Sequence, residues 1–184
     1  MTHRTLVLGG ARSGKSAHAE GLLPATATTY LATARRLPGD IEWDARIAVH
    51  VARRPSTWRT VETTDVAAAI GAATATDPAL LVDDLATWLT GVLDDTSAWD
   101  GGPAAVARAR EHADRLVGAV AHASVRLVLV SAEVGLGVVP ATRSGRLFRD
   151  ELGALNARLA AVCDEVLLLV AGIPLQVKSA NEVT

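Results

Sequence analysis

Residues 9–16 read Gly9-Gly10-Ala11-Arg12-Ser13-Gly14-Lys15-Ser16, and this stretch decides the fold of the 184-residue chain. It matches the phosphate-binding pattern G-x-x-x-x-G-K-[ST]. The apolar run Thr5 to Leu8 before it is typical of a buried strand, and a helix is expected from Ser16 to Leu23. The alternative is a chance glycine-rich turn before a helix. The flanking strand and helix make that the weaker interpretation, because strand, loop and helix are the order this pattern requires.

The chemistry expected of this phosphate loop (residues 9–16) is the binding of a nucleoside triphosphate. Its backbone N–H groups, together with the N-terminus of the following helix, favour negative charge. Lys15 is expected to reach the β- and γ-phosphates, and Ser16 is expected to hold Mg²⁺ through its hydroxyl. What the chain does with the nucleotide must be sought elsewhere in the sequence.

Composition narrows the class of protein. A chain of 184 residues is expected to form one domain, residues 1–184, with a substantial core. The net charge of −2 gives no electrostatic support for a nucleic-acid partner. Cys163 is the sole cysteine, which excludes an internal disulfide and a cysteine-based metal cluster. The longest nearly uninterrupted apolar stretch, Val166 to Leu175, is about half the length that spans a bilayer. No signal peptide is recognised, so a cytoplasmic protein is expected.

Strands and helices alternate along the rest of the chain. Further strands are expected at residues 27–33, 58–61, 79–83, 125–131 and 165–171, with 176–178 as a candidate for a last one. Helices are expected at residues 41–53, 65–75, 85–93, 104–122 and 144–162, and loops at 94–103 and 133–140. Unbroken aliphatic strands are typical of a parallel sheet buried on both faces. The sequence therefore predicts an α/β fold with a mostly parallel central sheet flanked by helices, similar to the phosphate-loop nucleoside triphosphatases.

An aspartate pair follows the strand expected at residues 79–83. Asp83 stands at the strand's end, the position from which phosphate-loop proteins often supply an acid to Mg²⁺. Asp84 precedes a helix and suits an N-cap, and the same role is the alternative for Asp83. The pattern alone does not separate the two aspartates, although the end of the strand favours Asp83 as the metal ligand.

Arg46, His50 and Arg53 share one face of the helix expected at residues 41–53. Two guanidinium groups beside an imidazole suit a phosphate, and a neutral histidine nitrogen can attack phosphorus. A solvated basic face is the alternative, and the spacing by itself favours it. Weaker candidates are Glu62 at the end of a short strand, the Gly-rich run after Glu133, and a group of three arginines at the start of a later helix: Arg143, Arg146 and Arg149.

Several blocks, taken together and in order, resemble one family. They are residues 9–16, 46–50, 54–62, 80–83, 87–90, 130–140, 148–150, 156–160 and 164–166. The block Glu133-Val134-Gly135-Leu136-Gly137-Val138-Val139-Pro140 is the most specific of them. The chain resembles, nearly end to end, the bifunctional adenosylcobinamide kinase/adenosylcobinamide-phosphate guanylyltransferase family of cobalamin biosynthesis.

The resemblance implies two reactions. In the first, the terminal phosphate of a nucleoside triphosphate, GTP or ATP, passes to the aminopropanol hydroxyl of adenosylcobinamide. In the second, GTP guanylylates a histidine and releases pyrophosphate, and the GMP is then transferred to adenosylcobinamide phosphate to give adenosylcobinamide-GDP. The histidine that matches the family's position is His50, which reverses the preference for a solvated helix face.

The family's site residues carry over position by position, and family members are trimers, so a homotrimer is expected. Lys15 and His50 would be catalytic, and Ser16 and Asp83 would hold Mg²⁺. The nucleotide contacts would be Gly9, Gly10, Ala11, Arg12, Ser13, Gly14, Lys15, Ser16, Thr33, Ala34, Arg35, Val51, Ala52, Arg53, Arg54, Glu62 and Asp83.

The sequence departs from the family's pattern at two positions. Val49 stands where some relatives have a histidine or a basic residue, and Gly91 stands where asparagine is common. Two other functions therefore remain as alternatives: a kinase that has lost guanylyl transfer, and a nucleotide-dependent binding module without transfer chemistry. The general base of the kinase is not identified by pattern, and Glu62 is a guess.

Overall fold

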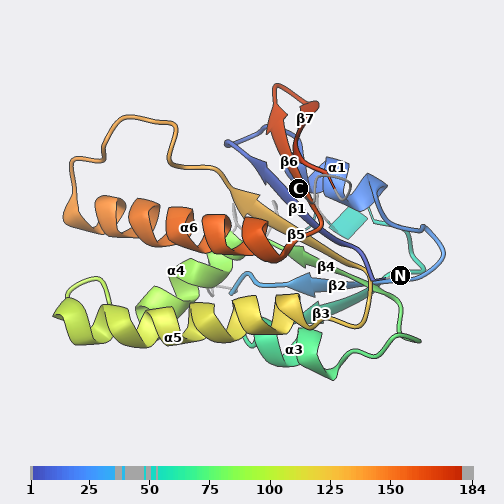
Figure 1. Ribbon diagram of the computed structural model, residues 1–184, viewed down its shortest axis with the longest axis horizontal. Coiled ribbons are helices and arrows are strands. Elements are labelled where there is room, and N and C mark those ends of the chain that lie inside the picture. The colour runs from blue at the N-terminus through green and yellow to red at the C-terminus, as the bar shows by residue number, and fades with distance from the viewer. Residues whose placement is uncertain (1, 36–38, 40–47, 49–50, 53, 180–184) are drawn as a thin grey trace.

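The computed structural model describes residues 2–35, 39, 48, 51–52 and 54–179 (Figure 1). The helix expected at residues 41–53 lies almost wholly outside the described residues, and so do Arg46, Val49, His50 and Arg53, which the sequence singled out.

The described residues form a seven-stranded sheet with the strand order β3-β2-β4-β5-β1-β6-β7. Every neighbouring pair is parallel except β6 and β7, which are antiparallel. The strands are β1 (Arg4–Gly9), β2 (Thr28–Ala32), β3 (Arg59–Glu62), β4 (Ala79–Asp83), β5 (Leu127–Ala132), β6 (Glu165–Val170) and β7 (Ile173–Lys178). The predicted α/β fold with a mostly parallel sheet is confirmed.

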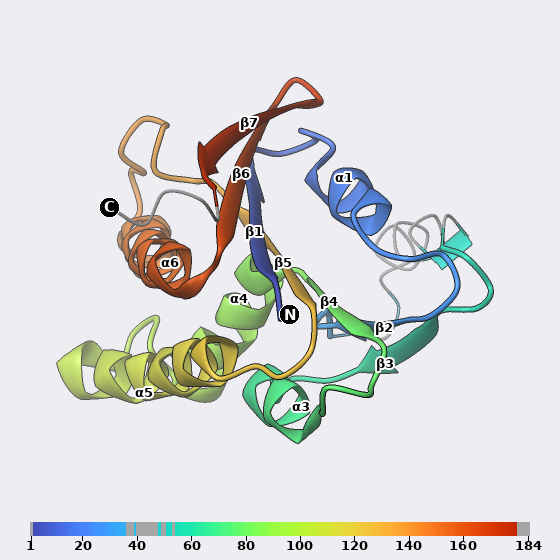
Figure 2. The same cartoon turned by 45° about the vertical axis from the view of Figure 1, so that its right-hand side comes forward.

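Helices cover both faces of this sheet (Figure 2). One face carries α1, and the other carries α3 to α6, with α5 and α6 as the two long helices (Figures 1 and 2). The helices are α1 (Lys15–Gly21), α3 (Val66–Ala72), α4 (Leu85–Asp95), α5 (Gly102–Ala121) and α6 (Arg143–Val162).

Each central strand divides its aliphatic side chains between two apolar cores. Leu6 of β1 and Leu129 of β5 belong to the larger core beneath α3 to α6, whereas Val7 and Val130 belong to the smaller core beneath α1. All four side chains have no exposed surface. Because successive side chains of a strand point to opposite faces, a strand buried on both faces must be apolar throughout, which is what the sequence shows.

Two expected boundaries are wrong, for local reasons. The stretch 94–103 was expected as a loop, but α4 continues to Asp95 and α5 begins at Gly102. Pro103 lies in the first turn of α5, where a missing N–H costs nothing. The last strand is longer than expected and pairs with β6 through a tight turn in which Ala171 and Gly172 both have positive φ. Pro174 is tolerated there because β7 is an edge strand.

Candidate active site

The phosphate loop joins the carboxyl end of β1 to the N-terminus of α1, and its backbone requires glycine at two positions. Gly14 adopts φ +87° as the N-cap of α1, a conformation that glycine tolerates at least cost. At Gly9 a Cβ would lie 2.4 Å from the Ser13 hydroxyl oxygen and 3.1 Å from the Leu169 carbonyl oxygen. The Gly172 amide, from the turn between β6 and β7, donates to the Ser13 carbonyl oxygen at 3.1 Å. Close contacts within the loop and a hydrogen bond from the β6–β7 turn therefore both fix its conformation.

A cavity of about 670 Å³ opens beside this loop, at the carboxyl ends of the central strands. Ligand sites in open parallel sheets gather at this end. Many of the residues expected at the site line the cavity together: Ala11, Arg12, Ser13, Gly14, Lys15, Ser16, Ala34, Val51, Arg54, Glu62 and Asp83. We call this space the phosphate-loop cavity.

The two aspartates after β4 have different surroundings. Asp83 accepts a hydrogen bond from the Ser16 hydroxyl at 3.2 Å and another from the Tyr30 hydroxyl at 2.6 Å. Asp84 accepts the Thr87 amide at 2.7 Å and is the N-cap of α4. The capping role that the sequence left open thus belongs to Asp84, and Asp83 faces the phosphate loop.

The donors at Ser16 and Asp83 suit Mg²⁺. A hydroxyl and a carboxylate are hard oxygen ligands, and Mg²⁺ in nucleotide sites typically takes one or two protein oxygens together with phosphate oxygens and water. Among the described residues there is no group of three or more histidine, cysteine, aspartate or glutamate side chains that could hold a metal without such help. The residues present therefore fit a metal that arrives with a nucleotide.

Basic groups of the cavity make few contacts with the rest of the described chain. The Lys15 ammonium has one long hydrogen bond, 3.4 Å, to the Gly10 carbonyl oxygen. The Arg54 guanidinium lies over the Tyr30 ring, 3.2 Å from its centroid, and donates to the Thr60 hydroxyl at 3.2 Å. Within the described chain, Arg54 Nε and Ser13 Oγ are buried without a hydrogen-bond partner. Such groups stabilise an anion that enters the cavity.

Burial is the main cause that raises the pKa of Tyr30, and the negative charge of Asp83 raises it further. The tyrosine therefore keeps its proton and remains a hydrogen-bond donor to Asp83. Sequence reasoning missed Tyr30 because a tyrosine within an apolar strand is indistinguishable from an ordinary core residue.

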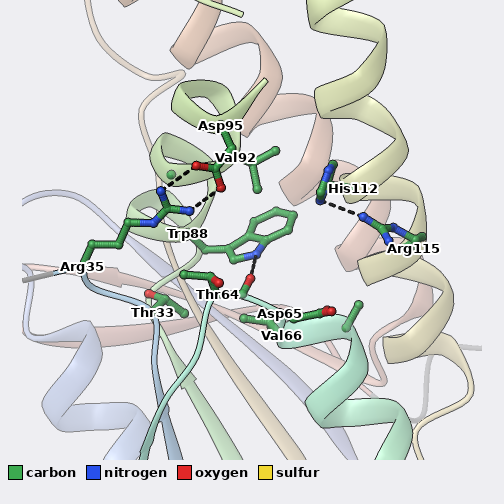
Figure 3. A pocket seen from close by; sticks show the side chains of 12 residues that line it. Thr33, Arg35, Thr64, Asp65, Val66, Trp88, Val92, Asp95, His112 and Arg115 are labelled. Carbon is green, nitrogen blue, oxygen red and sulfur yellow. Dashed lines mark hydrogen bonds and ion pairs between the residues drawn. The ribbon is translucent and has the colours of Figure 1, made fainter. Parts of the chain in front are cut away.

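Thr33 and Arg35 do not line the phosphate-loop cavity; they line a second pocket of about 210 Å³ between β2 and the helices α3, α4 and α5 (Figure 3). There the Arg35 guanidinium forms a bidentate ion pair with the Asp95 carboxylate, and the distance from Nη1 to Oδ1 is 2.7 Å. These hydrogen bonds raise the pKa of Arg35 and lower that of Asp95. Gly91 lies against this pair, since a Cβ there would be 3.1 Å from Arg35 Nε. The missing side chain at Gly91 leaves room for the Arg35 guanidinium.

Of the weaker candidate residues, some line the phosphate-loop cavity and others lie elsewhere. Glu133 lines the phosphate-loop cavity, and its carboxylate accepts the Gly135 amide at 2.6 Å. The three arginines at the start of α6 instead make local contacts: Arg143 donates to the Trp99 carbonyl oxygen, Arg146 to the Pro140 and Ala141 carbonyl oxygens, and Arg149 to Asp150. Three further residues that were expected to contact the nucleotide do not line the cavity: Gly9, Gly10 and Ala52.

Comparison with known proteins decides the family. Residues 5–177 match the family described as cobinamide kinase / cobinamide phosphate guanyltransferase. The chain belongs to this family. It is 42% identical over 182 residues to the bifunctional adenosylcobalamin biosynthesis protein CobU of Salmonella typhimurium, a match that covers 94% of this chain and 98% of the relative. It is 41% identical over 180 residues to the protein CobP of Pseudomonas aeruginosa, covering 95% and 97% of the two chains.

Membership of the cobinamide kinase / cobinamide phosphate guanyltransferase family confirms the predicted enzyme class and both predicted activities. The chain is a transferase that acts on cobinamide substrates with a nucleotide as the second substrate. Among the described residues, none of the helices is both long and apolar enough to cross a bilayer.

Proposed function

We propose that both reactions use the phosphate-loop cavity, with His50 as the residue that carries GMP. One observation supports this most directly. Lys15, Ser16 and Asp83 line the same cavity as Val51, and His50 is the immediate neighbour of Val51 in the sequence. A single nucleotide site would then serve phosphoryl transfer and guanylyl transfer in turn.

In the kinase reaction, the aminopropanol hydroxyl oxygen of adenosylcobinamide attacks the γ-phosphorus of the nucleoside triphosphate. The bond from the γ-phosphorus to its bridging oxygen breaks, and the nucleoside diphosphate leaves. Lys15 and the backbone amides of the phosphate loop bind the β- and γ-phosphates and orient them. Ser16 and Asp83 would hold Mg²⁺, which neutralises charge on the phosphate oxygens when bound.

In the guanylyl reaction, a neutral imidazole nitrogen of His50 attacks the α-phosphorus of GTP. A phosphorus–nitrogen bond forms, the bond to the β-phosphate oxygen breaks, and pyrophosphate leaves. Arg54, with a buried Nε that lacks a partner among the described residues, is suited to bind a phosphoryl oxygen. A phosphate oxygen of adenosylcobinamide phosphate then displaces the imidazole, which yields adenosylcobinamide-GDP.

Incubation with α-labelled GTP tests the role of His50. The wild-type protein should take up acid-labile label, and His50→Ala should take up none. His122→Ala is the matched control, because His122 is the C-cap of α5 and, among the described residues, its ring contacts the Gly118 carbonyl oxygen. Label on His50→Ala would show that another residue carries GMP. Unlabelled wild type that still phosphorylates cobinamide would select the kinase-only alternative, and GTP binding without turnover of any corrinoid would select the binding module.

Glu62 is proposed as the general base of the kinase, because it lines the cavity at the end of β3. Glu133 lines the same cavity from the end of β5 and provides the comparison. Glu62→Gln should lower kinase turnover by about 100-fold, the usual scale for a lost general base. The same loss in Glu133→Gln, with Glu62→Gln active, would move the base to Glu133.

We also propose a homotrimer in the cytoplasm. Large apolar side chains lie exposed on the loop after β5 and on β7, and a contact with a second copy of the chain would bury them: Leu136, Val138, Val139, Ile173, Leu175 and Val177. Sedimentation should give three times the mass of the 19.1 kDa chain. A monomer at micromolar concentration would refute the assembly but leave the site unaffected. The proposed use of GTP as a substrate supports the cytoplasmic location.

A further inference from the structure

Tyr30 joins two parts of the phosphate-loop cavity. Its side chain lines the cavity from β2 and is only 2% exposed. The hydroxyl donates to one carboxylate oxygen of Asp83, and the face of the ring supports the Arg54 guanidinium. One buried side chain therefore contacts both the carboxylate opposite Ser16 and a cation of the cavity wall.

We propose that Tyr30 is a positioning residue: its hydroxyl orients Asp83 toward the metal, and its ring fixes Arg54 toward the nucleotide phosphates. The inference rests on the proposed function of the cavity. It assigns Tyr30 no contact with substrate.

The hydroxyl acts on the geometry of the carboxylate. Asp83 accepts Tyr30 through Oδ2 and Ser16 through Oδ1, so each oxygen has a separate hydroxyl donor. When Ser16 turns its oxygen to a metal, the 2.6 Å bond from Tyr30 remains to hold Oδ1 in the same direction. Partners that orient a metal-binding carboxylate in this way typically change metal affinity by about 10-fold to 100-fold when they are removed.

The ring acts on Arg54 independently of the hydroxyl. Within the described chain, Arg54 has one side-chain hydrogen bond, to Thr60, and its Nε is buried without a partner. The Tyr30 ring, 3.2 Å away, is thus the main support that fixes the plane of the guanidinium. Phenylalanine would keep this support and lose the hydroxyl, whereas leucine would lose both.

The experiment measures binding of a fluorescent GTP analogue to the full-length protein, with Mg²⁺ titrated and then with Mg²⁺ removed by EDTA. Tyr30→Phe should raise the Mg²⁺ concentration at half-saturation about 10-fold and leave affinity in EDTA unchanged. Tyr30→Leu should also weaken binding in EDTA, by about 3-fold to 10-fold, because Arg54 loses its support.

Thr28→Val is the matched control. Thr28 lies on the same face of β2, is 1% exposed and donates its hydroxyl to the Pro24 carbonyl oxygen at 3.2 Å, but it does not line the cavity. This variant loses a buried hydroxyl bond as Tyr30→Phe does, so its thermal unfolding should shift similarly while its Mg²⁺ dependence stays at the wild-type value.

Coupling to Asp83 gives a second measurement. In an Asp83→Asn background, Tyr30→Phe should cause no further change in Mg²⁺ dependence, because the hydroxyl acts through that carboxylate. An unchanged half-saturation in Tyr30→Phe, or an equal loss with and without Mg²⁺, would overturn the inference. Failure of the proposed function is separate, since it would appear in the wild type as absent label and absent corrinoid turnover, neither of which this binding experiment uses.

Discussion

The chain contains two lysines, and they lie at opposite ends of the sheet with opposite surroundings. Lys178, at the end of β7, donates to three carbonyl oxygens around the C-terminus of α6: Ala160 at 2.9 Å, Ala161 at 3.2 Å and Cys163 at 2.7 Å. Lys15, in the phosphate loop, has a single hydrogen bond of 3.4 Å to the other described residues. A cation whose donors are satisfied by the protein holds structure, whereas one that lacks partners is available to a ligand.

The neighbours of each lysine follow the same division. Beside Lys178, at the amino ends of the parallel strands, Arg4 donates to Asp164 through Nε at 3.0 Å and through Nη2 at 2.8 Å, and the Arg4 amide adds a third bond at 2.8 Å. Beside Lys15, Ser13 Oγ and Arg54 Nε are buried without a partner in the described chain. Arg4 and Asp164 at the amino end are thus paired with each other, whereas Lys15, Ser13 and Arg54 line the phosphate-loop cavity at the carboxyl end.

The largest expected effect comes from Lys15→Met. Loss of the ammonium that binds the phosphates should lower kinase kcat by at least about 100-fold. The free energy of unfolding should change by less than about 0.5 kcal/mol, because the side chain makes one long, exposed bond. Steady-state kinase assays and urea unfolding at neutral pH measure the two quantities. A large loss of stability would show that Lys15 also holds the loop together.

Lys178→Met should show the reverse. Three carbonyl oxygens at the end of α6 lose a charged donor, and the favourable interaction of a cation with a helix C-terminus is also lost. The free energy of unfolding should fall by about 1–3 kcal/mol. Kinase kcat of the folded variant should remain within about twofold of the wild type, measured below the unfolding transition. A large fall in kcat without unfolding would contradict the division between the two ends.

Asp164→Asn tests whether the stabilisation at the amino end of the sheet depends on pH. Hydrogen bonds from Arg4 are the main cause that lowers the pKa of Asp164 to about 2, from the value of 3.8 for a free carboxyl group. The stabilisation is therefore fully present above about pH 4 and is lost as pH falls toward 2. Urea unfolding should show Asp164→Asn less stable than wild type by about 1 kcal/mol at pH 7, allowing for partial exposure, and the difference should shrink at pH 3. A difference that is constant with pH would mean that the charge is not responsible.

Gly91→Ala should have the smallest effect, and it tests whether the second pocket differs from the phosphate-loop cavity. The second pocket also lies toward the carboxyl ends of β2 and β3, but its cation Arg35 is already paired with Asp95. The new methyl group displaces a flexible guanidinium, while alanine favours the helix by up to about 1 kcal/mol. The melting temperature should therefore change little, and nucleotide affinity should stay at the wild-type value. A marked loss of affinity would make the second pocket part of the nucleotide site.

Much of the fold could be predicted because its signals are local. The phosphate loop has a fixed spacing, and β4 has the predicted bounds Ala79–Asp83, since its aliphatic run ends at a turn proline on one side and a charged residue on the other. The edge strand β7 was underestimated because Pro174 and Gln176 interrupt its apolar pattern. Its pairing depends on β6, which the local sequence does not encode.

Site residues could be predicted from the sequence only where a motif fixes their positions. Lys15, Ser16 and Asp83 follow from spacing relative to a strand end, and the structure brings all three to one cavity. Tyr30 could not be recognised, because its role depends on Asp83 and Arg54, which are 53 and 24 positions away in sequence. Arg35 was assigned to the nucleotide, but its partner Asp95, 60 positions away, takes its side chain to the second pocket. The prediction for His50 lies outside the described residues and stays a prediction.

The hydrogen bond from the Gly172 amide to the Ser13 carbonyl oxygen affects how the chain folds during translation. The phosphate loop is translated before β5 and β6, but β1 lies between these two strands, and the loop is supported by the turn that follows β6. Residues 9–16 therefore reach their final conformation only after the turn between β6 and β7 has been translated. A nascent chain has no complete phosphate loop until β6 and the turn after it have emerged, so a nucleotide that binds this loop cannot assist the earlier stages of folding and stabilises only the folded enzyme.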